Sequence, residues 1–306
     1  MLQTPELVFL MGAHDGLSAR IAEVEGFEAV WASGFCISTA LGVRDSDEAS
    51  WSQLLSVIES MTEAVSIPIV VDGDTGYGNF NTARRFAHKA ERLGAAGVCF
   101  EDKLFPKMNS FVGDRHELAD VDEFCGKLRA CKEEQEEPAF CVIARVEALI
   151  AGLGMEEALE RANAYRRAGA DAIFIHSRKR VADEIEEFAG RWGGDLPLVI
   201  SPTTYSATPT EVFRQGGISA VIWANHSMRA AVTAMRRVCR EIHSAQSVKG
   251  TEEAGLAPLA EVFELMHYDE LEAAERRFLA AKPDDTAGGP DADGARVARR
   301  SPGKLR

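Results

Sequence analysis

The stretch Gly94-Ala-Ala-Gly-Val-Cys-Phe100 has close counterparts at other places in the chain, and this repetition decides the fold. The counterparts are Gly26-Phe-Glu-Ala-Val-Trp-Ala32, Gly169-Ala-Asp-Ala-Ile-Phe-Ile175 and Gly217-Ile-Ser-Ala-Val-Ile-Trp223. In each copy a glycine suited to the left-handed end of a helix precedes a short apolar run. A run that is apolar at successive positions is typical of a parallel strand covered on both faces. The repeat therefore predicts alternating helices and buried parallel strands.

Adding apolar runs that lack the preceding glycine gives eight short strands, and eight is the number of strands in a closed parallel barrel. They are expected at Leu7–Met11, Ala29–Ala32, Ile67–Val71, Gly97–Phe100, Phe140–Ala144, Ala172–Ile175, Leu198–Ile200 and Ala220–Trp223. Amphipathic segments between them predict crossover helices. The clearest of these segments are Trp51–Ala64, Asn81–Leu93, Met155–Ala168 and Arg229–Ile242. The predicted fold class is α/β, a parallel (β/α)8 barrel of the TIM type.

The chain is expected to form one domain, residues 1–281, followed by a disordered tail, residues 282–306. Barrels of this type commonly run to roughly 250 residues as a single domain, and the chain has 306 residues. Beyond the barrel, Leu259–Leu279 predicts additional C-terminal helices whose unused apolar positions favour packing on another subunit. Pro, Gly, Asp and Arg dominate the tail, which has too few large apolar residues to offset the entropy of ordering it.

Composition excludes several classes of partner. The formal net charge of −14 argues against nucleic acid, because binding its phosphates requires a basic surface. The six cysteines are scattered without a CxxC pair, which is typical of reduced thiols in a cytoplasmic protein. The first residues resemble a strand more than a signal peptide, and no stretch has the roughly 18 apolar residues that a membrane span needs.

Polar residues follow the predicted strands at the end of the barrel where active sites lie. Strand by strand, they are Ser33-Gly34, Asp72-Gly-Asp74, Glu101-Asp-Lys103, Arg145-Val-Glu147, His176-Ser177 and Asn225-His226.

Asp72, Asp74 and Glu101 predict a metal site. Asp72 and Asp74 are two residues apart, so both side chains point to the same side if the chain is extended, and Glu101 ends the next strand at a similar height. Carboxylates this close need a cation, and oxygen ligands suit Mg²⁺, with Mn²⁺ as a substitute. The alternative is that the aspartates cap helices or form turns, but three carboxylates on neighbouring strands favour the metal.

Arg145 and His176 predict an anionic substrate, a small 2-oxo or enol acid with a second anionic group. Arg145 offers a bidentate fork for a carboxylate or phosphonate, which Glu147 could hold in place. The alternative is an Arg145–Glu147 ion pair that only closes the rim. His176 could donate to a phosphoryl oxygen or act as an acid, or it could be a packing residue, and His226 is the weaker candidate.

A long loop follows Glu101 and predicts a lid. It reads Asp102-Lys-Leu-Phe-Pro-Lys-Met-Asn-Ser-Phe-Val-Gly-Asp-Arg115 and mixes Lys, Asn and Ser with Pro and Gly. Long loops after barrel strands usually close over the active site. The alternative is a passive surface loop, in which Phe105, Met108 and Phe111 would have no evident reason to be apolar.

Three segments together resemble the mutases of the isocitrate lyase and phosphoenolpyruvate mutase superfamily. They are Asp72-Gly-Asp-Thr-Gly-Tyr-Gly-Asn79, Glu101-Asp-Lys-Leu-Phe-Pro-Lys-Met-Asn-Ser110 and Leu41-Gly-Val-Arg-Asp45. The resemblance extends from about Leu7 to Ala280. The second segment is the most particular to mutases, whereas the first is shared across the superfamily, with Gly73 where many lyases have alanine.

The resemblance implies Mg²⁺-dependent interconversion of phosphoenolpyruvate and 3-phosphonopyruvate, the first step of phosphonate biosynthesis. It implies that Asp72 binds the metal directly, that Asp74 and Glu101 act largely through water, and that Asp45 lies beside the transferring phosphoryl group as nucleophile or electrostatic guide. Lys107 would lie on the closing loop. Substrate contacts are implied for Trp31, Ser33, Gly34, Phe35, Asn109, Ser110, Arg145 and His176.

The resemblance also implies partners. It suggests a homodimer or homotetramer in which a terminal helix is exchanged between subunits. Replacing a P–O bond by a P–C bond has a thermodynamic cost, so we expect a decarboxylase that consumes phosphonopyruvate.

Four other functions are alternatives. Phosphonopyruvate hydrolase is the nearest, but it typically lacks the asparagine at position 109. A 2-methylisocitrate or isocitrate lyase needs a loop cysteine as acid or base, and none occurs between Cys99 and Cys125. A relative that decarboxylates oxaloacetate could use the same metal and enolate chemistry. An inactive barrel scaffold is disfavoured because the candidate carboxylates, Arg145 and His176 are all present.

Overall fold

The computed structural model describes residues 2, 4, 6–113, 116–253 and 255–279. The chain divides into two compact units, Met1–Leu256 and Ala257–Arg306. The predicted tail, residues 282–306, lies outside the described residues.

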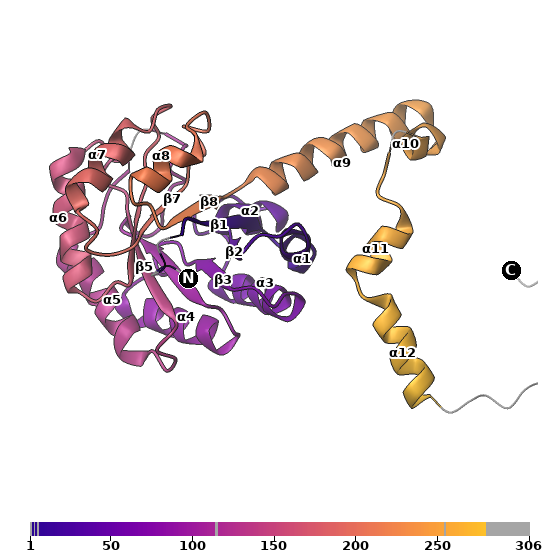
Figure 1. Cartoon of the computed structure of the whole chain (residues 1–306), viewed down its shortest axis with the longest axis horizontal. Coiled ribbons are helices and arrows are strands. Elements are labelled where there is room, and N and C mark those ends of the chain that lie inside the picture. Colours follow the sequence, from indigo (N-terminus) through magenta and orange to yellow (C-terminus); the bar gives the residue numbers. More distant parts are fainter. Residues whose placement is uncertain (1, 3, 5, 114–115, 254, 280–306) are drawn as a thin grey trace, which may run out of the picture. The chain divides into compact units, whose positions relative to one another are not determined.

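The first unit is a closed barrel of parallel strands in the order β1 to β8, with β8 pairing back to β1 (Figure 1). This confirms the predicted (β/α)8 fold. The strands are β1 (Val8–Ala13), β2 (Ala29–Ala32), β3 (Ile69–Asp72), β4 (Gly97–Glu101), β5 (Cys141–Val146), β6 (Ala172–Ile175), β7 (Leu198–Ile200) and β8 (Ala220–Trp223).

Three strands extend beyond the predicted carboxyl end and take in a site residue, since β3 continues to Asp72, β4 to Glu101 and β5 to Val146. β5 continues two residues beyond Ala144, because Arg145 pairs in register with Glu101 of β4 and with Phe174 of β6. β3 begins at Ile69, directly after Pro68, which has no N–H to offer a neighbouring strand. The extension of β5 places Arg145 within the barrel wall at its carboxyl end.

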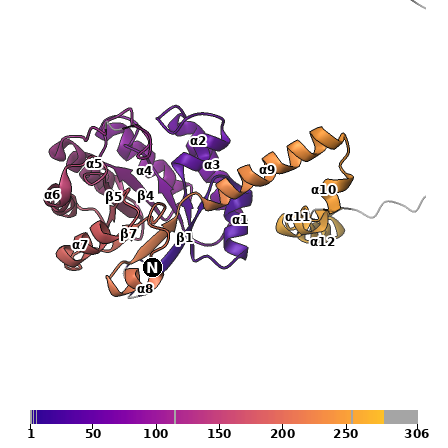
Figure 2. The same cartoon turned by 90° about the horizontal axis from the view of Figure 1, so that it is seen from above.

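Helices cover the outside of the ring, and α1 and α3 lie side by side there, as do α4 and α5 (Figures 1 and 2). The helices of this unit are α1 (Gly16–Val24), α2 (Gly34–Ala40), α3 (Trp51–Ala64), α4 (Phe80–Arg92), α5 (Val121–Glu134), α6 (Gly154–Arg167), α7 (Asp183–Trp192), α8 (Thr210–Gln215), α9 (His226–Ala245) and α10 (Lys249–Glu253).

Local caps set the helix starts. Ser50 and Gln53 form a capping box that begins α3 at the predicted residue. Ser33 accepts from the Cys36 N–H and starts α2 directly after β2.

The core has two parts. A large cluster fills the space between the strands and the helices and includes Phe86, Phe124 and Phe188. A smaller cluster fills the interior of the ring, where Trp31 and Phe174 meet edge to face with their ring centres 6.1 Å apart. These two rings form an apolar floor beneath the carboxyl ends of the strands.

The second unit contains α11 (Leu259–Leu265) and α12 (Tyr268–Phe278), which confirms additional helices within the predicted range Leu259–Leu279. Several of their apolar side chains are exposed in the single chain, among them Leu259, Leu271 and Phe278. In the part of the chain that the structure describes, no helix has the length and apolarity to cross a membrane.

Candidate active site

A cavity of about 780 Å³ opens at the carboxyl ends of the strands. Nearly all the candidate site residues line it, namely Trp31, Ser33, Phe35, Asp45, Asp72, Glu101, Lys107, Asn109, Ser110, Arg145 and His176. The two remaining candidates, Gly34 and Asp74, contact the lining residues from behind. The structure therefore brings the predicted residues together at one site.

The carboxylates of Asp72 and Asp74 converge, although not by the predicted route. Asp72 ends β3, and Asp74 has a positive φ of 50°, so it sits in a turn rather than in an extended strand. The turn is fixed to β4, because Glu101 donates its N–H to the Asp74 carbonyl (2.8 Å) and Gly73 donates to the Cys99 carbonyl (2.8 Å). The two carboxylates therefore converge through this turn, and the extended conformation expected from their spacing was wrong.

Two glycines allow this close packing. Gly34 donates its N–H to Oδ2 of Asp72 (3.2 Å), and a Cβ there would lie 2.9 Å from Oδ1 of Asp74. A Cβ at Gly73 would lie 2.6 Å from the ring of Phe100. A side chain at either position would push the carboxylates or the strand beneath them out of place.

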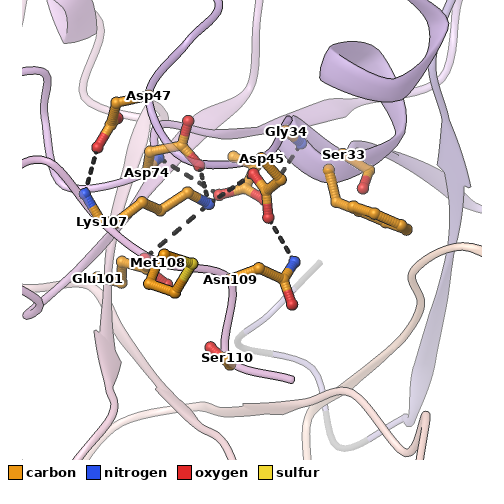
Figure 3. A network of polar contacts seen from close by, with 12 residues as sticks. Ser33, Gly34, Asp45, Asp47, Asp74, Glu101, Lys107, Met108, Asn109 and Ser110 are labelled. Atoms are coloured by element: carbon orange, nitrogen blue, oxygen red, sulfur yellow. Dashed lines mark hydrogen bonds and ion pairs between the residues drawn. The ribbon is translucent and has the colours of Figure 1, made fainter. Parts of the chain in front are cut away.

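Lys107 and Asn109 reach from the loop into the carboxylate group (Figure 3). The Lys107 Nζ lies 2.9 Å from Oδ1 of Asp45 and 2.5 Å from Oδ1 of Asp74. Asn109 donates its Nδ2–H to the other oxygen of Asp45 (2.6 Å), and the Lys107 N–H donates to Asp47 (2.6 Å). Both oxygens of Asp45 are therefore bound by the loop.

These contacts set the charges. Burial works against ionisation of Asp45, but Lys107 and Asn109 outweigh it and lower the pKa of Asp45. Burial also opposes the charge on Lys107, yet Asp74 and Asp45 raise its pKa well above the usual value. Burial raises the pKa of Asp72 and of Asp74, with further repulsion from neighbouring carboxylates. The site holds more negative charge than one lysine neutralises.

On the other side of the cavity, Arg145 is held as expected. Its Nε donates to Oε1 of Glu147, its Nη2 to Ser110 (3.2 Å), and its guanidinium lies 5.0 Å from the ring centre of Phe174. His176 Nδ1 lies 2.8 Å from both Glu147 Oε1 and Arg145 Nη2. The predicted pairing of Arg145 with Glu147 is confirmed.

The charge states in this group follow from burial and contact. Burial would raise the pKa of Glu147, but Arg145, Lys103 and His176 hold it well below its usual range. Burial and the adjacent Arg145 lower the pKa of His176. His176 is therefore a neutral ring at neutral pH, with Nε2 left to face a ligand.

Sequence reasoning missed Lys103 and Asp47. The Lys103 side chain is 2% exposed and donates to Ser110 Oγ (2.5 Å) and to the Met108 carbonyl (3.0 Å), with Glu147 Oε2 at 3.3 Å. Its place two residues after Glu101 was a signal, but position alone could not show that this lysine turns inward. The spacing Asp45-Ser-Asp47 was the corresponding signal for Asp47.

The three apolar loop residues and His226 are placed differently from one another. Phe111 meets the His176 ring edge to face with ring centres 5.6 Å apart. All three loop residues are about half exposed, but Met108 and Phe111 line the cavity and Phe105 does not. His226 begins α9 and packs on Trp223, so it does not line the cavity.

The donor set fits a hard divalent cation. Among the described residues, no three His, Cys, Asp or Glu side chains are already arranged as a metal cage, because Lys107 lies between the carboxylates. Oδ1 of Asp74 and Oε1 of Glu101 are nevertheless buried, and the Lys107 Nζ lies 2.5 Å from the first and 4.0 Å from the second. Buried carboxylate oxygens suit Mg²⁺ better than a soft metal.

Comparison with known proteins agrees with this geometry. Residues 1–243 match the family model described as phosphoenolpyruvate phosphomutase. A phosphoenolpyruvate phosphomutase from Streptomyces hygroscopicus is 60% identical over 282 residues, which covers 92% of this chain and 90% of the relative. A phosphonopyruvate hydrolase from Variovorax sp. is 40% identical over 280 residues, covering 91% of this chain and 96% of the relative.

Solved structures show the same relationship. The crystal structure of phosphoenolpyruvate phosphomutase from Streptomyces platensis superposes with a TM-score of 0.89 at 42% identity, covering 91% of this chain and 97% of the other. A phosphonopyruvate hydrolase in complex with oxalate and Mg++ superposes with a TM-score of 0.86 at 39% identity, covering 91% and 96%.

Proposed function

The chain belongs to the phosphoenolpyruvate phosphomutase family, and from this premise we propose how its residues interconvert phosphoenolpyruvate and 3-phosphonopyruvate. The reaction is an isomerisation: the bond between phosphorus and the enol oxygen breaks, and a bond between phosphorus and the methylene carbon forms. The observation that carries the proposal is the Asn109–Asp45 hydrogen bond of 2.6 Å, which the loop forms above the carboxylate group. Asn109 is also the residue by which the sequence favours a mutase over a hydrolase.

Arg145 and His176 bind the substrate in this proposal. The Arg145 guanidinium is fixed by Glu147 and Ser110 and offers donors to an anionic oxygen of the pyruvate enolate. His176 is neutral, and with Nδ1 accepting from Arg145 Nη2 the ring carries its proton on Nε2, which can donate one hydrogen bond to the phosphoryl group without adding charge. Further substrate contacts are assigned to Trp31, Ser33 and Phe35, which line the cavity, and to Gly34, whose N–H is bound to Asp72.

Asp45 guides the phosphoryl group electrostatically. Its carboxylate is ionised, and its two oxygens are bound by Lys107 and Asn109. A carboxylate with both oxygens engaged is a poor nucleophile, which favours the guiding role over a covalent one. Lys107 and Asn109 remain beside it to receive the negative oxygens of a metaphosphate-like group.

We assign the metal site to Asp72, Asp74 and Glu101, with Asp72 as the direct ligand and the other two acting largely through water. Mg²⁺ is the metal that these oxygens fit, and Mn²⁺ would substitute. When bound, it supplies positive charge that stabilises the enolate. A relative of 39% identity has been solved with Mg++.

Exclusion of water falls to the loop. Lys107, Asn109 and Ser110 face the cavity from this loop, and Phe111 covers His176. A site closed in this way protects a reactive phosphoryl group from hydrolysis.

Assembly, location and pathway are further parts of the proposal. The exposed apolar side chains of α11 and α12 support a homodimer or homotetramer, with residues 1–281 as one domain in each subunit. All six cysteines are free thiols, which supports a cytoplasmic location. A decarboxylase that removes phosphonopyruvate would draw the unfavourable reaction forward.

A coupled assay tests the proposal. Purified protein is given phosphonopyruvate and Mg²⁺, and NADH consumption is followed with lactate dehydrogenase, first alone and then with pyruvate kinase and ADP added. A mutase gives a signal only after pyruvate kinase and ADP are present, because its product is phosphoenolpyruvate. A signal with lactate dehydrogenase alone means that pyruvate forms directly, and the protein is then a hydrolase.

A further inference from the structure

A buried polar cluster lies behind the loop, outside the cavity. Asp102 and Tyr165 are 0% exposed and Arg161 is 7% exposed, and none of these three described residues lines the cavity. Oδ2 of Asp102 accepts hydrogen bonds from the Tyr165 hydroxyl (2.6 Å) and from Arg161 Nη1 (3.1 Å). A buried carboxylate with a guanidinium and a phenol is costly to remove from water, so its position needs an explanation.

The cluster ties together the two ends of the loop. The chain leaves the barrel at Asp102 and returns at Ala119, and the Ala119 N–H donates to the Asp102 carbonyl (2.9 Å). Arg161 Nη1 donates to the Ala119 carbonyl as well (3.0 Å). Just inside these ends, the Leu104 N–H donates to the Glu117 carbonyl (3.0 Å). Arg161 of α6 therefore binds both ends of the loop, at Asp102 and at Ala119.

The same aspartate also fixes the group that orients Arg145. Oδ1 of Asp102 accepts the Glu147 N–H (2.8 Å), and the Asp102 N–H donates to the Arg145 carbonyl (3.1 Å). Glu147 in turn contacts Arg145, Lys103 and His176. Movement of Asp102 would loosen the loop base and the substrate-binding group together.

We propose that Asp102, Arg161 and Tyr165 are positioning residues that hold the loop base closed and so determine whether the phosphoryl group reaches carbon or water. The inference rests on the proposed function. With phosphonopyruvate as the substrate, water then competes with the enolate oxygen for the phosphoryl group: the P–C bond breaks, the water oxygen bonds to phosphorus, and a proton from water goes to the methylene carbon. The products are then pyruvate and inorganic phosphate.

The test uses Arg161→Met and Tyr165→Phe. Arg161→Met keeps side-chain bulk but removes the brace, and Tyr165→Phe keeps the ring that packs on Phe124 and removes only the hydroxyl. Arg166→Met is the matched control, since Arg166 lies on the same helix and pairs with the half-exposed Asp195. Hydrogen exchange of the loop-base amides and the phosphorus products from phosphonopyruvate are measured for each full-length protein.

In Arg161→Met, we expect amides at Leu104 and Ala119 to exchange about tenfold faster or more, as for the loss of a hydrogen bond to a charged group. Inorganic phosphate should rise from background to roughly a tenth of the product, because a loosened loop base admits water to the phosphoryl group. Tyr165→Phe should shift both readouts in the same direction by less, and Arg166→Met should shift neither.

Wild-type exchange rates at the loop base in both variants, or a phosphate share equal to the wild type, would overturn the inference. If Arg161→Met does not fold, Tyr165→Phe decides. The exchange measurement needs no turnover, so it judges the brace even if the wild type fails to form phosphoenolpyruvate, a result that would reject only the proposed function.

Discussion

Asn109 offers the sharpest single substitution. Its Nδ2–H donates to Oδ2 of Asp45 (2.6 Å), and its Oδ1 accepts the Phe111 N–H (3.0 Å). Asn109→Ala removes one hydrogen bond to a charged group, about 1.5–3 kcal/mol, and one between neutral groups, about 1 kcal/mol. The same amide is placed to donate to the phosphoryl group in transit, so we expect the substitution to lower kcat more than it lowers stability.

The expected loss in kcat is about 100-fold to 1000-fold, which is typical when one donor to a developing charge is removed. The coupled assay with pyruvate kinase and lactate dehydrogenase measures it. Asn109→Asp should be at least as slow, because it places a second carboxylate against Asp45. Leu104→Ala is the control, since Leu104 is on the same loop but 41% exposed and outside the cavity lining.

A kcat for Asn109→Ala within about fivefold of the wild type, a cost well under 1.4 kcal/mol, would refute the reasoning. Asn109 would then serve only to shape the loop, and the assignment of a mutase on this residue would lose its basis.

Three other outcomes follow from the site. Glu147→Gln should lower the free energy of unfolding by about 3–5 kcal/mol in urea titrations, because the buried Arg145 and Lys103 lose their shared counter-charge; an unchanged midpoint would show that the group is solvated. Gly34→Ala should raise the Mg²⁺ concentration for half-maximal activity about tenfold or more, roughly the effect of one lost contact to a charge, whereas Gly126→Ala, which has open space, should not. The pKa of His176 in the folded protein is depressed below 6.5, so the unfolded chain binds more protons at acid pH and the free energy of unfolding falls as pH drops through 6.5. His176→Gln should reduce the slope of the free energy of unfolding against pH between pH 7.5 and 5.5. An identical slope would count against the neutral ring.

The barrel was predictable because its signal is repeated. The Gly-capped apolar runs predict β2, β4, β6 and β8, and apolar runs without the glycine predict the other strands. The strands from β2 to β8 begin or end within two residues of the predicted positions. The chain around Asp74 was not predictable, because residue spacing cannot show that the strand ends at Asp72 and turns. That turn depends on hydrogen bonds to β4, which is distant in sequence.

The site was predictable only in part. Strand-end position was enough to select Asp72, Glu101, Arg145 and His176, since the carboxyl ends of barrel strands meet in space. Asp45 lies in the segment between α2 and α3 and was selected by resemblance alone. Lys103, Asp102 and Arg161 are buried polar residues that also contact residues distant in sequence, and sequence reasoning has no period or spacing that reveals such partners.

The most direct test of the central claim is ³¹P NMR of the wild-type protein with phosphonopyruvate and Mg²⁺. For a mutase, we expect the phosphonate resonance to be replaced by that of phosphoenolpyruvate, without a resonance from inorganic phosphate. Inorganic phosphate as the product would contradict it, because the loop would then admit water and the protein would be a hydrolase.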